Sequence, residues 1–436
     1  MGSEKKYILI VGMGKVGNAV AAYLIKQGKD IVITDGDISK KQDAEIFEKQ
    51  GIKTEIGFHN ENTFKNAGKI IVSPGVPLDI PGLVTARRHG VPVSGELDII
   101  ADRIDVPLVA VTGTNGKTTT TALLGKMLEE SGLNVFVCGN IGTPIVEYIT
   151  RADDTGARAD IIVAEISSFQ LDTSDNFRPD IAVLLNIAQD HLDRYSDYQE
   201  YARSKWSIFK NQTKDQTAII NAEIEDVNLE TAKITPKIIY FNNGRPLTIN
   251  KQHIDPGRAQ LKGTHNNENI AAAALAAYAA GATVKGVLKG LETFTPMPHR
   301  LEFVKSIKKI DFYNDSKATN PDAVKRAVQC FDNNILLIMG GQEKDTDFTC
   351  LKESFKTKVK KLIVMGEAGD KITQTFSDVC DVCRAVSMED AVRLAAEYAH
   401  GGDTVLLAPG CASFDMYKDY SERGFDFINQ VKGLEN

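Results

Sequence analysis

The chain lacks the features that mark membrane and secreted proteins. No apolar run approaches about 18 residues, the length that a membrane-spanning helix needs. The start, from Met1 to Lys6, leads directly into a predicted strand and has no apolar signal-peptide core. We therefore expect no membrane insertion and a cytoplasmic location.

Positive charge is not in excess. The 436 residues include 51 Lys and Arg against 58 Asp and Glu, which gives a formal net charge of −7. A protein that binds a nucleic-acid backbone needs a basic surface that offsets the phosphate charges. The sequence therefore predicts no nucleic-acid partner.

Cysteine is sparse as well. The six cysteines are spread over the chain, which suits a reducing compartment. Cys380 and Cys383 are the one close pair, and without a second pair or clustered histidines they give little support to a metal or redox site. Internal repeats are absent, and the Ala-rich run 271–280 predicts a tightly packed helix.

Strand and helix signals alternate along the whole chain. Its length is too great for one hydrophobic core, and a hydrophobic content of 42% can supply two or three. Alternation of this kind predicts parallel sheets with helical crossovers. Strands are predicted at 7–11, 30–34, 70–72, 91–93, 106–111, 135–138, 161–166, 181–186, 311–314, 335–339, 362–365 and 404–408.

A glycine-rich loop, Gly12–Gly17, joins the first predicted strand to a helix at about 14–27, and Asp35 ends the second strand. This arrangement is the dinucleotide fingerprint in outline. The same geometry can place any diphosphate at a helix N-terminus, so a nicotinamide enzyme is one alternative among several. A rigid loop, Ser73–Pro77, follows a later strand at the edge where ligands bind in open α/β sheets.

The most informative motif is a second glycine-rich loop, Gly113–Thr119, which lies between an apolar strand and a helix-forming stretch. Small residues let backbone N–H groups point at phosphate oxygens, and Lys117 adds a mobile positive charge. The hydroxyl of Thr118 can complete the coordination of a phosphate-bound Mg²⁺. The loop therefore predicts an enzyme that handles ATP.

Further candidates follow the next strands. Glu165 ends a buried strand, where a carboxylate is a natural metal ligand. His191 lies in a polar segment after the following strand, which favours a second metal ligand. Lys205 lies on a predicted helix at 198–209, and its spacing alone indicates an exposed lysine.

Polar loops also follow the strands of the last third of the chain, where function is common. Asp315 and Ser316 belong to one of them, and helix capping or turn formation is the alternative role for both. The polar segments are Gly263–Asn269, Pro298–Glu302, Asn314–Pro321, Gly340–Asp345 and Pro409–Asp415.

These signals define the expected fold class, which is α/β with three domains. We expect a Rossmann-like N-terminal domain at 1–101, a central P-loop ATPase-like α/β domain at 102–297 and a C-terminal Rossmann-like α/β domain at 298–436. Pro296 and Pro298 indicate a hinge before the third domain.

Several motifs, in this order, closely resemble the Mur ligases over essentially the whole chain. They are Gly113–Thr119, Glu165–Gln170, Asp190–Asp193, His265–Asn269, His299–Arg300, Asn314–Asn320 and Cys411–Ser413.

The resemblance implies an ATP-dependent ligase of peptidoglycan precursor synthesis that works as a monomer. Its substrates would be UDP-N-acetylmuramoyl-L-alanine, D-glutamate and ATP. The substrate carboxylate would attack the γ-phosphate of ATP, and the amine of D-glutamate would then displace phosphate from the acyl phosphate. The alternatives are a sister Mur ligase that adds another amino acid, a folylpolyglutamate synthase, which would lack the first glycine loop, a nicotinamide oxidoreductase and a non-catalytic nucleotide sensor.

The resemblance also implies a role for individual residues. Contacts to ATP are expected from Gly113, Thr114, Asn115, Gly116, Lys117, Thr118, Thr119, Asn269, Arg300 and Asp315. Two Mg²⁺ ions would be held by Thr118, Glu165, His191 and Lys205, the last as a carbamate formed with CO₂, and Lys117, Glu165, His191 and Lys205 would be catalytic. The UDP substrate would contact Gly14, Lys15, Val16, Asp35, Ser73, Pro74, Gly75 and Asn140. D-glutamate would contact Thr319, Lys344, Ser413, Phe414 and Tyr420.

Overall fold

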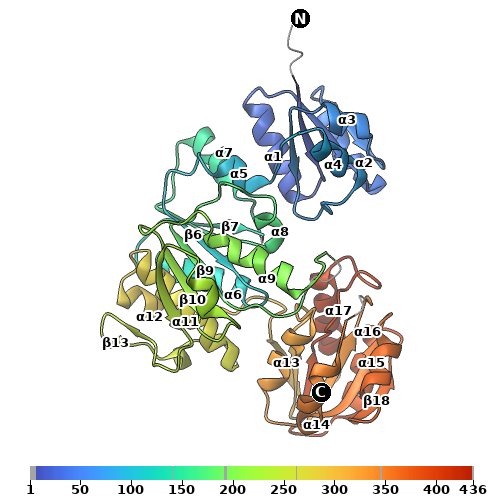
Figure 1. The fold of residues 1–436 in the computed structure, drawn as a ribbon. Helices are drawn as coiled ribbons and strands as arrows, with labels where there is room; N and C mark the ends of the chain where they lie inside the picture. The colour runs from blue at the N-terminus through green and yellow to red at the C-terminus, as the bar shows by residue number, and fades with distance from the viewer. Residues whose placement is uncertain (1–5, 141, 191–193, 262, 344–345, 435–436) are drawn as a thin grey trace, which may run out of the picture. The chain divides into compact units, whose positions relative to one another are not determined.

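The computed structural model describes residues 6–140, 142–190, 194–261, 263–343 and 346–434 and contains three sheets of mainly parallel strands (Figure 1). The chain forms two compact units. The first unit comprises residues 1–187, 194–255 and 269–292, and the second comprises 188–193, 256–268 and 293–436. The first unit holds two of the large sheets and the second unit holds the other.

The N-terminal sheet has five parallel strands in the order β3-β2-β1-β4-β5. Helices α1 and α2 pack with one apolar cluster of this sheet, and α3 and α4 pack with another, so both faces are covered. Burial on both faces explains the continuous apolar run of β1. The strands are β1 (Ile8–Val11), β2 (Ile31–Asp35), β3 (Lys53–Ile56), β4 (Lys69–Val72) and β5 (Val93–Ser94), and the α-helices are α1 (Lys15–Lys26), α2 (Lys41–Glu48), α3 (Glu61–Asn66), α4 (Pro81–Arg88) and α5 (Glu96–Ile100).

The central sheet has six parallel strands in the order β11-β10-β9-β6-β8-β7. Strand β6 lies between β8 and β9, so the loops that follow these three strands meet at one edge. Its strands are β6 (Leu108–Thr112), β7 (Val135–Gly139), β8 (Ile161–Glu165), β9 (Ile181–Leu184), β10 (Thr217–Asn221) and β11 (Lys237–Phe241). Around it run α6 (Lys117–Glu129), α7 (Val146–Thr155), α8 (Ser168–Leu171), α9 (Tyr198–Trp206), α10 (Val227–Thr231), α11 (Thr264–Ala279), α12 (Val284–Thr293) and the hairpin β12 (Thr248–Ile249) and β13 (Gln252–His253).

The sheet of the second unit has the order β14-β15-β19-β16-β17-β18, and β14 is antiparallel to β15 while the other pairs are parallel. Alternate residues of β16 enter two apolar clusters, one shared with α13, α14 and α15 and one with α16 and α17. The elements are β14 (Glu302–Ile307), β15 (Ile310–Asn314), β16 (Ile335–Gly340), β17 (Val359–Met365), β18 (Asp381–Arg384), β19 (Thr404–Leu407), α13 (Pro321–Gln329), α14 (Lys352–Lys358), α15 (Gly369–Phe376), α16 (Met388–Tyr398) and α17 (Tyr420–Gly433).

The two close cysteines lie on opposite faces of this sheet. Cys380 packs against the cluster of α13 to α15, and Cys383 packs against the cluster of α16 and α17. Their side chains therefore do not face each other, and a two-cysteine metal or redox site is not formed here.

The α/β class is confirmed, and every strand range predicted from the sequence overlaps an observed strand. The predicted helix at 198–209 ends as an α-helix at Trp206 and continues as a 3₁₀ turn. The missed strands include β3, β14 and β18, which lie at sheet edges and carry charged residues. Strands β10 and β11 were also missed, although both contain apolar runs. The domain boundaries that we placed after residues 101 and 297 remain predictions.

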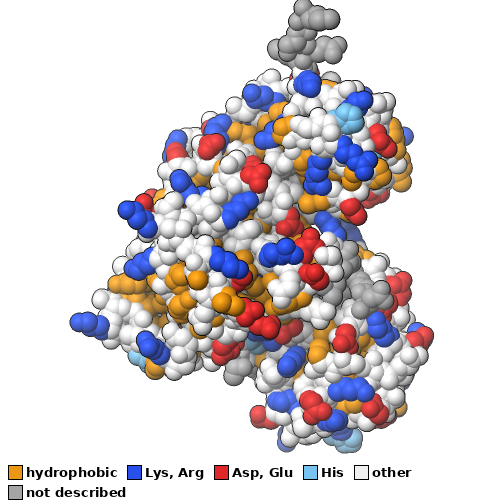
Figure 2. All heavy atoms as spheres, viewed as in Figure 1, with side chains coloured by type: hydrophobic (Ala, Val, Ile, Leu, Met, Phe, Trp, Pro, Cys, Tyr) orange, Lys and Arg blue, Asp and Glu red, His pale blue; other side chains and the backbone are white. Residues whose placement is uncertain are grey.

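Acidic and basic side chains are mixed on the face drawn in Figure 2, so no single-sign patch dominates it. This mixture agrees with the small net charge. Within the described residues, every helix falls short of the length and apolar character needed to cross a bilayer.

A buried arginine organises the second unit. Arg423 on α17 is 2% exposed, and burial lowers the pKa of its guanidinium to about 10. It joins the last residue of β16 to the loops that follow β15 and β19. Its acceptors are the carbonyls of Ser316 (2.9 Å), Cys411 (3.1 Å), Ala412 (3.3 Å) and Gly340 (3.4 Å) and the hydroxyl of Ser316 (3.0 Å).

We expect Arg423→Met to destabilise the protein by about 3 kcal/mol or more, because several buried carbonyls would lose their donor. The measurement is the thermal midpoint from calorimetry. Arg393→Met is the matched control, since Arg393 on α16 is exposed and pairs only with neighbours on its own helix. Equal midpoints for the two variants would contradict this role of Arg423.

Candidate active site

The loop between β6 and α6 has the backbone of a phosphate-binding loop. Gly113 and Gly116 have φ values of 155° and 85°, which favour glycine. A Cβ on Gly116 would lie 2.2 Å from Oδ1 of Asn269, so the loop packs tightly against α11. Gly116 is the N-cap of α6 and offers no side-chain cap, which leaves N–H groups of the first turn for an anion.

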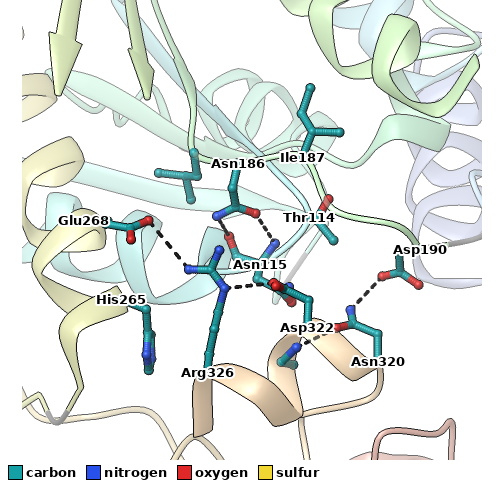
Figure 3. Close-up of polar contacts among 12 residues, drawn as sticks. Thr114, Asn115, Asn186, Ile187, Asp190, His265, Glu268, Asn320, Asp322 and Arg326 are labelled. Atoms are coloured by element: carbon teal, nitrogen blue, oxygen red, sulfur yellow. Dashed lines mark hydrogen bonds and ion pairs between the residues drawn. The ribbon is translucent and has the colours of Figure 1, made fainter. Parts of the chain in front are cut away.

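Asn186, which follows β9, clamps this loop (Figure 3). Its Oδ1 accepts the N–H of Asn115 at 2.9 Å, and its Nδ2 donates to the carbonyl of Asn115 at 3.0 Å. The carbonyl of Asn186 accepts the N–H of Thr114 at 3.0 Å. One residue therefore fixes two consecutive loop residues, and its position directly after a strand was the only sequence signal for it.

Two lysine amines meet at the carbonyl of Gly113. Lys117 donates to it at 2.8 Å and Lys205 at 2.9 Å, and Lys117 also donates to the carbonyl of Thr114 at 2.8 Å. Two lysine amines at one carbonyl oxygen bring positive charge to the loop, so this site attracts negative charge. Phosphate oxygens would supply that charge.

The expectation of an exposed Lys205 is wrong, because its side chain is 2% exposed. Its helix α9 faces the loop, and Tyr201, one turn earlier, lies on the same side. The Tyr201 hydroxyl is 3.1 Å from Oγ1 of Thr114, and the Lys205 amine lies 4.5 Å from the centre of the Tyr201 ring. The i, i+4 spacing to Lys205 was the sequence signal that could have revealed Tyr201.

Glu165 joins the loop to the neighbouring strand. Its Oε2 accepts the hydroxyl of Thr118 at 2.8 Å, and its Oε1 accepts Nδ2 of Asn140 at 3.0 Å. Thr118 and Glu165 are both buried and both present oxygen atoms beside a phosphate loop. Mg²⁺ prefers oxygen ligands, so these two residues fit a Mg²⁺ site. The other two predicted metal ligands have different outcomes: Lys205 lies at the same loop, and His191 is outside the described residues.

A cavity of about 490 Å³ in the first unit is lined by all eight residues predicted to contact the UDP substrate. Sequence reasoning did not assign His59, Ile80 and Gln170, which also line it. The Asp35 carboxylate accepts the N–H groups of Met13 at 2.6 Å and Asp37 at 2.8 Å, so it shapes the glycine loop. The hydroxyl of Ser73 donates to the carbonyl of Gly12 at 2.9 Å on the other side.

The cavity and the phosphate loop share one side chain. Asn140 follows β7, lines the cavity and donates to Glu165. Because β7 and β8 are neighbours in register, Gly139 pairs with Glu165 and the two sites adjoin.

Polar residues of the second unit gather at the carboxyl ends of β15 and β19. The Asp315 carboxylate accepts the N–H of Leu301 at 3.3 Å, and burial raises its pKa to about 7 although the positive charge of Arg300 opposes the rise. Ser316 donates its hydroxyl to the carbonyl of Tyr420 at 2.8 Å. Both side chains therefore connect their loop to distant segments, and the predicted contact between Asp315 and the nucleotide remains a prediction.

The predicted D-glutamate residues occupy different environments in the second unit. Ser413 is buried, Phe414 is 64% exposed and Tyr420 begins α17. The Lys317 amine lies 3.7 Å from the centre of the Tyr420 ring. Thr319 precedes α13, and Lys344 lies outside the described residues.

An ion-pair group in the second unit was not predicted (Figure 3). Arg326 on α13 contacts Asp322 at 2.8 Å and Glu268 at 3.6 Å. His265 lies nearby, and burial together with the Arg326 charge lowers its pKa to about 4. In the same unit, Asn320 donates to Asp190 at 2.9 Å. These contacts link segments 188–193 and 256–268 to α13.

The phosphate loop, its two lysines, its buried carboxylate and the adjoining cavity define a nucleotide-dependent enzyme of the α/β class. Three family models match the chain: "Mur ligase MurD-like, N-terminal domain" at residues 6–95, "Mur ligase middle domain" at 111–277 and "Mur ligase, glutamate ligase domain" at 299–411. The chain belongs to the Mur ligase family, which confirms the resemblance.

Full-length relatives agree with this assignment. A "UDP-N-acetylmuramoylalanine--D-glutamate ligase" of Desulfosudis oleivorans is 42% identical over 99% of this chain and 97% of its own length. A protein of the same name from Desulfatibacillum aliphaticivorans is also 42% identical, over 100% of both chains.

Solved structures share the fold at lower identity. A pseudomurein peptide ligase type C from Methanothermus fervidus has a TM-score of 0.62 and 20% identity, and covers 98% of this chain and 100% of that chain. The UDP-N-acetylmuramate-alanine ligase MurC from Thermotoga maritima has a TM-score of 0.61 and 19% identity with the same coverage.

We expect Asn186→Ala to weaken ATP binding roughly tenfold, because two hydrogen bonds that shape the loop are lost. Titration calorimetry with a non-hydrolysable ATP analogue measures the effect. Asn211→Ala is the matched control, because Nδ2 of Asn211 also donates to two carbonyls, of Asp175 and Phe177, away from the loop. If both variants bind the analogue as tightly as the unaltered protein does, Asn186 does not shape the loop for ATP binding.

Proposed function

We propose that this chain joins D-glutamate to UDP-N-acetylmuramoyl-L-alanine in peptidoglycan precursor synthesis, with conversion of ATP to ADP and phosphate. The observation that carries the proposal is the hydrogen bond between Asn140 and Glu165 at 3.0 Å. It joins a cavity of nucleoside-diphosphate size to a phosphate loop. A reaction between a UDP-linked carboxylate and the γ-phosphate of ATP requires this adjacency.

The two ends of the cavity bind different parts of the substrate. The diphosphate of the substrate binds at the N-terminus of α1, where Gly14 and Lys15 line the cavity and N–H groups face an anion. The muramoyl arm extends past Ser73–Gly75 to Asn140, beside Glu165. This direction brings the reacting carboxylate to the phosphate loop.

The loop Gly113–Thr119 holds the triphosphate of ATP. Lys117 turns from the carbonyls of its own loop to the β- and γ-phosphates, and the Lys205 amine lies at the same carbonyl of Gly113. The attacking carboxylate and the triphosphate are both anionic, so these positive groups reduce their repulsion.

Thr118 and Glu165 would hold one Mg²⁺, and His191 with a Lys205 carbamate would hold a second. Bound Mg²⁺ neutralises phosphate charge and orients the transferred group. Formation of a carbamate requires the neutral amine of Lys205, whose side chain is buried beside the loop. The carbamate would also replace the repulsion between two amines with an attraction to Lys117.

The second unit supplies the remaining contacts. Arg300 and Asp315 are the proposed nucleotide contacts in this unit, and Asn269 is a proposed nucleotide contact in the first unit. The incoming D-glutamate contacts Thr319, Phe414 and Tyr420, while Lys344 pairs with one of its carboxylates and Ser413 donates a hydrogen bond. We propose that the enzyme acts as a cytoplasmic monomer with domains at 1–101, 102–297 and 298–436.

The test is phosphate release from ATP with UDP-N-acetylmuramoyl-L-alanine and one of four amino acids: D-glutamate, L-glutamate, D-aspartate or L-lysine. We expect release, and an amide product of the correct mass, with D-glutamate alone. Product with another amino acid would assign the chain to a sister ligase instead. No product with any of them, together with reduction of a nicotinamide cofactor, would overturn the ligase proposal.

Lys205→Ala should lower the rate of ligation on the order of 100-fold, because a buried charged group at the phosphate loop is lost. Added acetate or formate should restore part of the rate by taking the place of the carbamate carboxylate. Lys210→Ala is the control, since Lys210 is half-exposed and bonds the carbonyl of Ser174. Loss of activity without rescue by acetate or formate would argue against the carbamate.

A further inference from the structure

His59 lines the cavity of the first unit and has no assigned role. It follows β3 and lies beside Asp35 and Gly36, which end and follow β2. In parallel sheets of this type the nucleoside of a bound nucleotide lies near the end of the second strand, and the diphosphate lies at the first helix. Asn140 marks the reacting end, so His59 lies at the nucleoside end.

The contacts of His59 fix the orientation of its ring. Its Nδ1 is 2.9 Å from Oγ1 of Thr34, and that hydroxyl also lies 3.3 Å from the carbonyl oxygen of Phe58. When the hydroxyl donates to this carbonyl, Nδ1 is the donor to Thr34 and Nε2 keeps a lone pair. The ring also packs edge-to-face on Phe64, with 5.6 Å between the ring centres.

Gly36 leaves room beside this lone pair. A Cβ at position 36 would lie 3.2 Å from Nε2 of His59, closer than most side-chain contacts. The absence of a side chain therefore keeps Nε2 accessible from the cavity that both residues line.

Electrostatics around His59 favour the neutral ring. Burial lowers its pKa, and the carboxylates of Asp35 and Glu55 oppose this effect. Both carboxylates are engaged elsewhere: Asp35 accepts two backbone N–H groups, and Glu55 pairs with Lys53 at 2.9 Å and accepts the hydroxyl of Thr63 at 2.7 Å.

We propose that Nε2 of His59 accepts a hydrogen bond from the uridine moiety of the substrate and makes His59 a specificity-determining residue of the cavity. The donor is either the N3–H of uracil or a ribose hydroxyl, since both are hydrogen-bond donors of a nucleoside. The inference rests on the proposed function, because it takes the UDP-linked substrate as the occupant.

The first test measures the dissociation constant of UDP by titration calorimetry on the full-length chain. His59→Phe keeps the ring that packs on Phe64 but removes the acceptor, so we expect UDP to bind roughly fivefold more weakly. His59→Gln keeps an acceptor and should bind within about twofold of the unaltered protein. His89→Phe is the matched control, because His89 is exposed and its Nδ1 contacts the carbonyl of Thr85 on its own helix.

Analogues identify the donor. A His59→Phe penalty that is present for UDP but absent for CDP assigns the uracil N3–H, which cytosine lacks. A penalty that is equal for UDP and CDP but absent for 2′-deoxy-UDP assigns the ribose. If His59→Phe binds all three ligands as the unaltered protein does, the inference is overturned.

The dependence on pH tests the tautomer. Below its lowered pKa the ring carries protons on both nitrogens and cannot accept, so UDP affinity relative to His59→Gln should fall once the pH passes below the pKa of His59, which an NMR titration of the ring locates. An unchanged or higher relative affinity below that pKa would mean that Nε2 donates, and would reject the acceptor role.

Steady-state kinetics separate this inference from the proposed function. We expect His59→Phe to raise the KM of the UDP substrate while the KM of ATP and kcat stay the same. If His59→Phe ligates normally with an unaltered KM for the UDP substrate, the role of His59 is rejected and the proposed function still stands. If the unaltered chain fails to bind UDP or to ligate, the proposed function is rejected, and the inference about His59 is rejected with it.

Discussion

The phosphate site depends on how the backbone of the loop after β6 is held. The carbonyl of Gly113 accepts two lysine amines, and the side chain of Asn186 binds both backbone groups of Asn115. These contacts come from the loop's own helix, from α9 and from the end of β9. Contacts within the protein therefore shape the loop, and the two lysine amines place positive charge where phosphate would bind.

The same edge of the central sheet places this loop beside a second binding region. Strands β6, β8 and β7 are consecutive in the sheet, so Thr118, Glu165 and Asn140 form a continuous hydrogen-bonded row. Asn140 ends this row in the cavity of the first unit. A ligand in the cavity and a nucleotide on the loop would thus meet through side chains whose spacing the parallel register fixes.

In the second unit, loops at the carboxyl ends of strands are also held by hydrogen bonds from a buried side chain. Loops after parallel strands expose carbonyl groups, and buried carbonyls require donors. Arg423 supplies donors to the loops after β15 and β19 and to the last residue of β16, and the loop after β19 contains Ser413, a residue of the proposed amino-acid site. The support of this site comes from a helix near the C-terminus, far along the chain from Ser316 and Gly340.

The sequence by itself determined the α/β class, twelve of the strands and the identity of the phosphate loop, because these depend on local patterns of apolar residues and glycine. The eight residues that it predicted for the UDP substrate all line one cavity. Only the tertiary structure decided that Lys205 is buried, that Asn186 and Tyr201 hold the loop, and that His59 faces the cavity. Burial and partners of these residues depend on which strands become neighbours, and contacts between distant segments leave no periodic signal in the sequence.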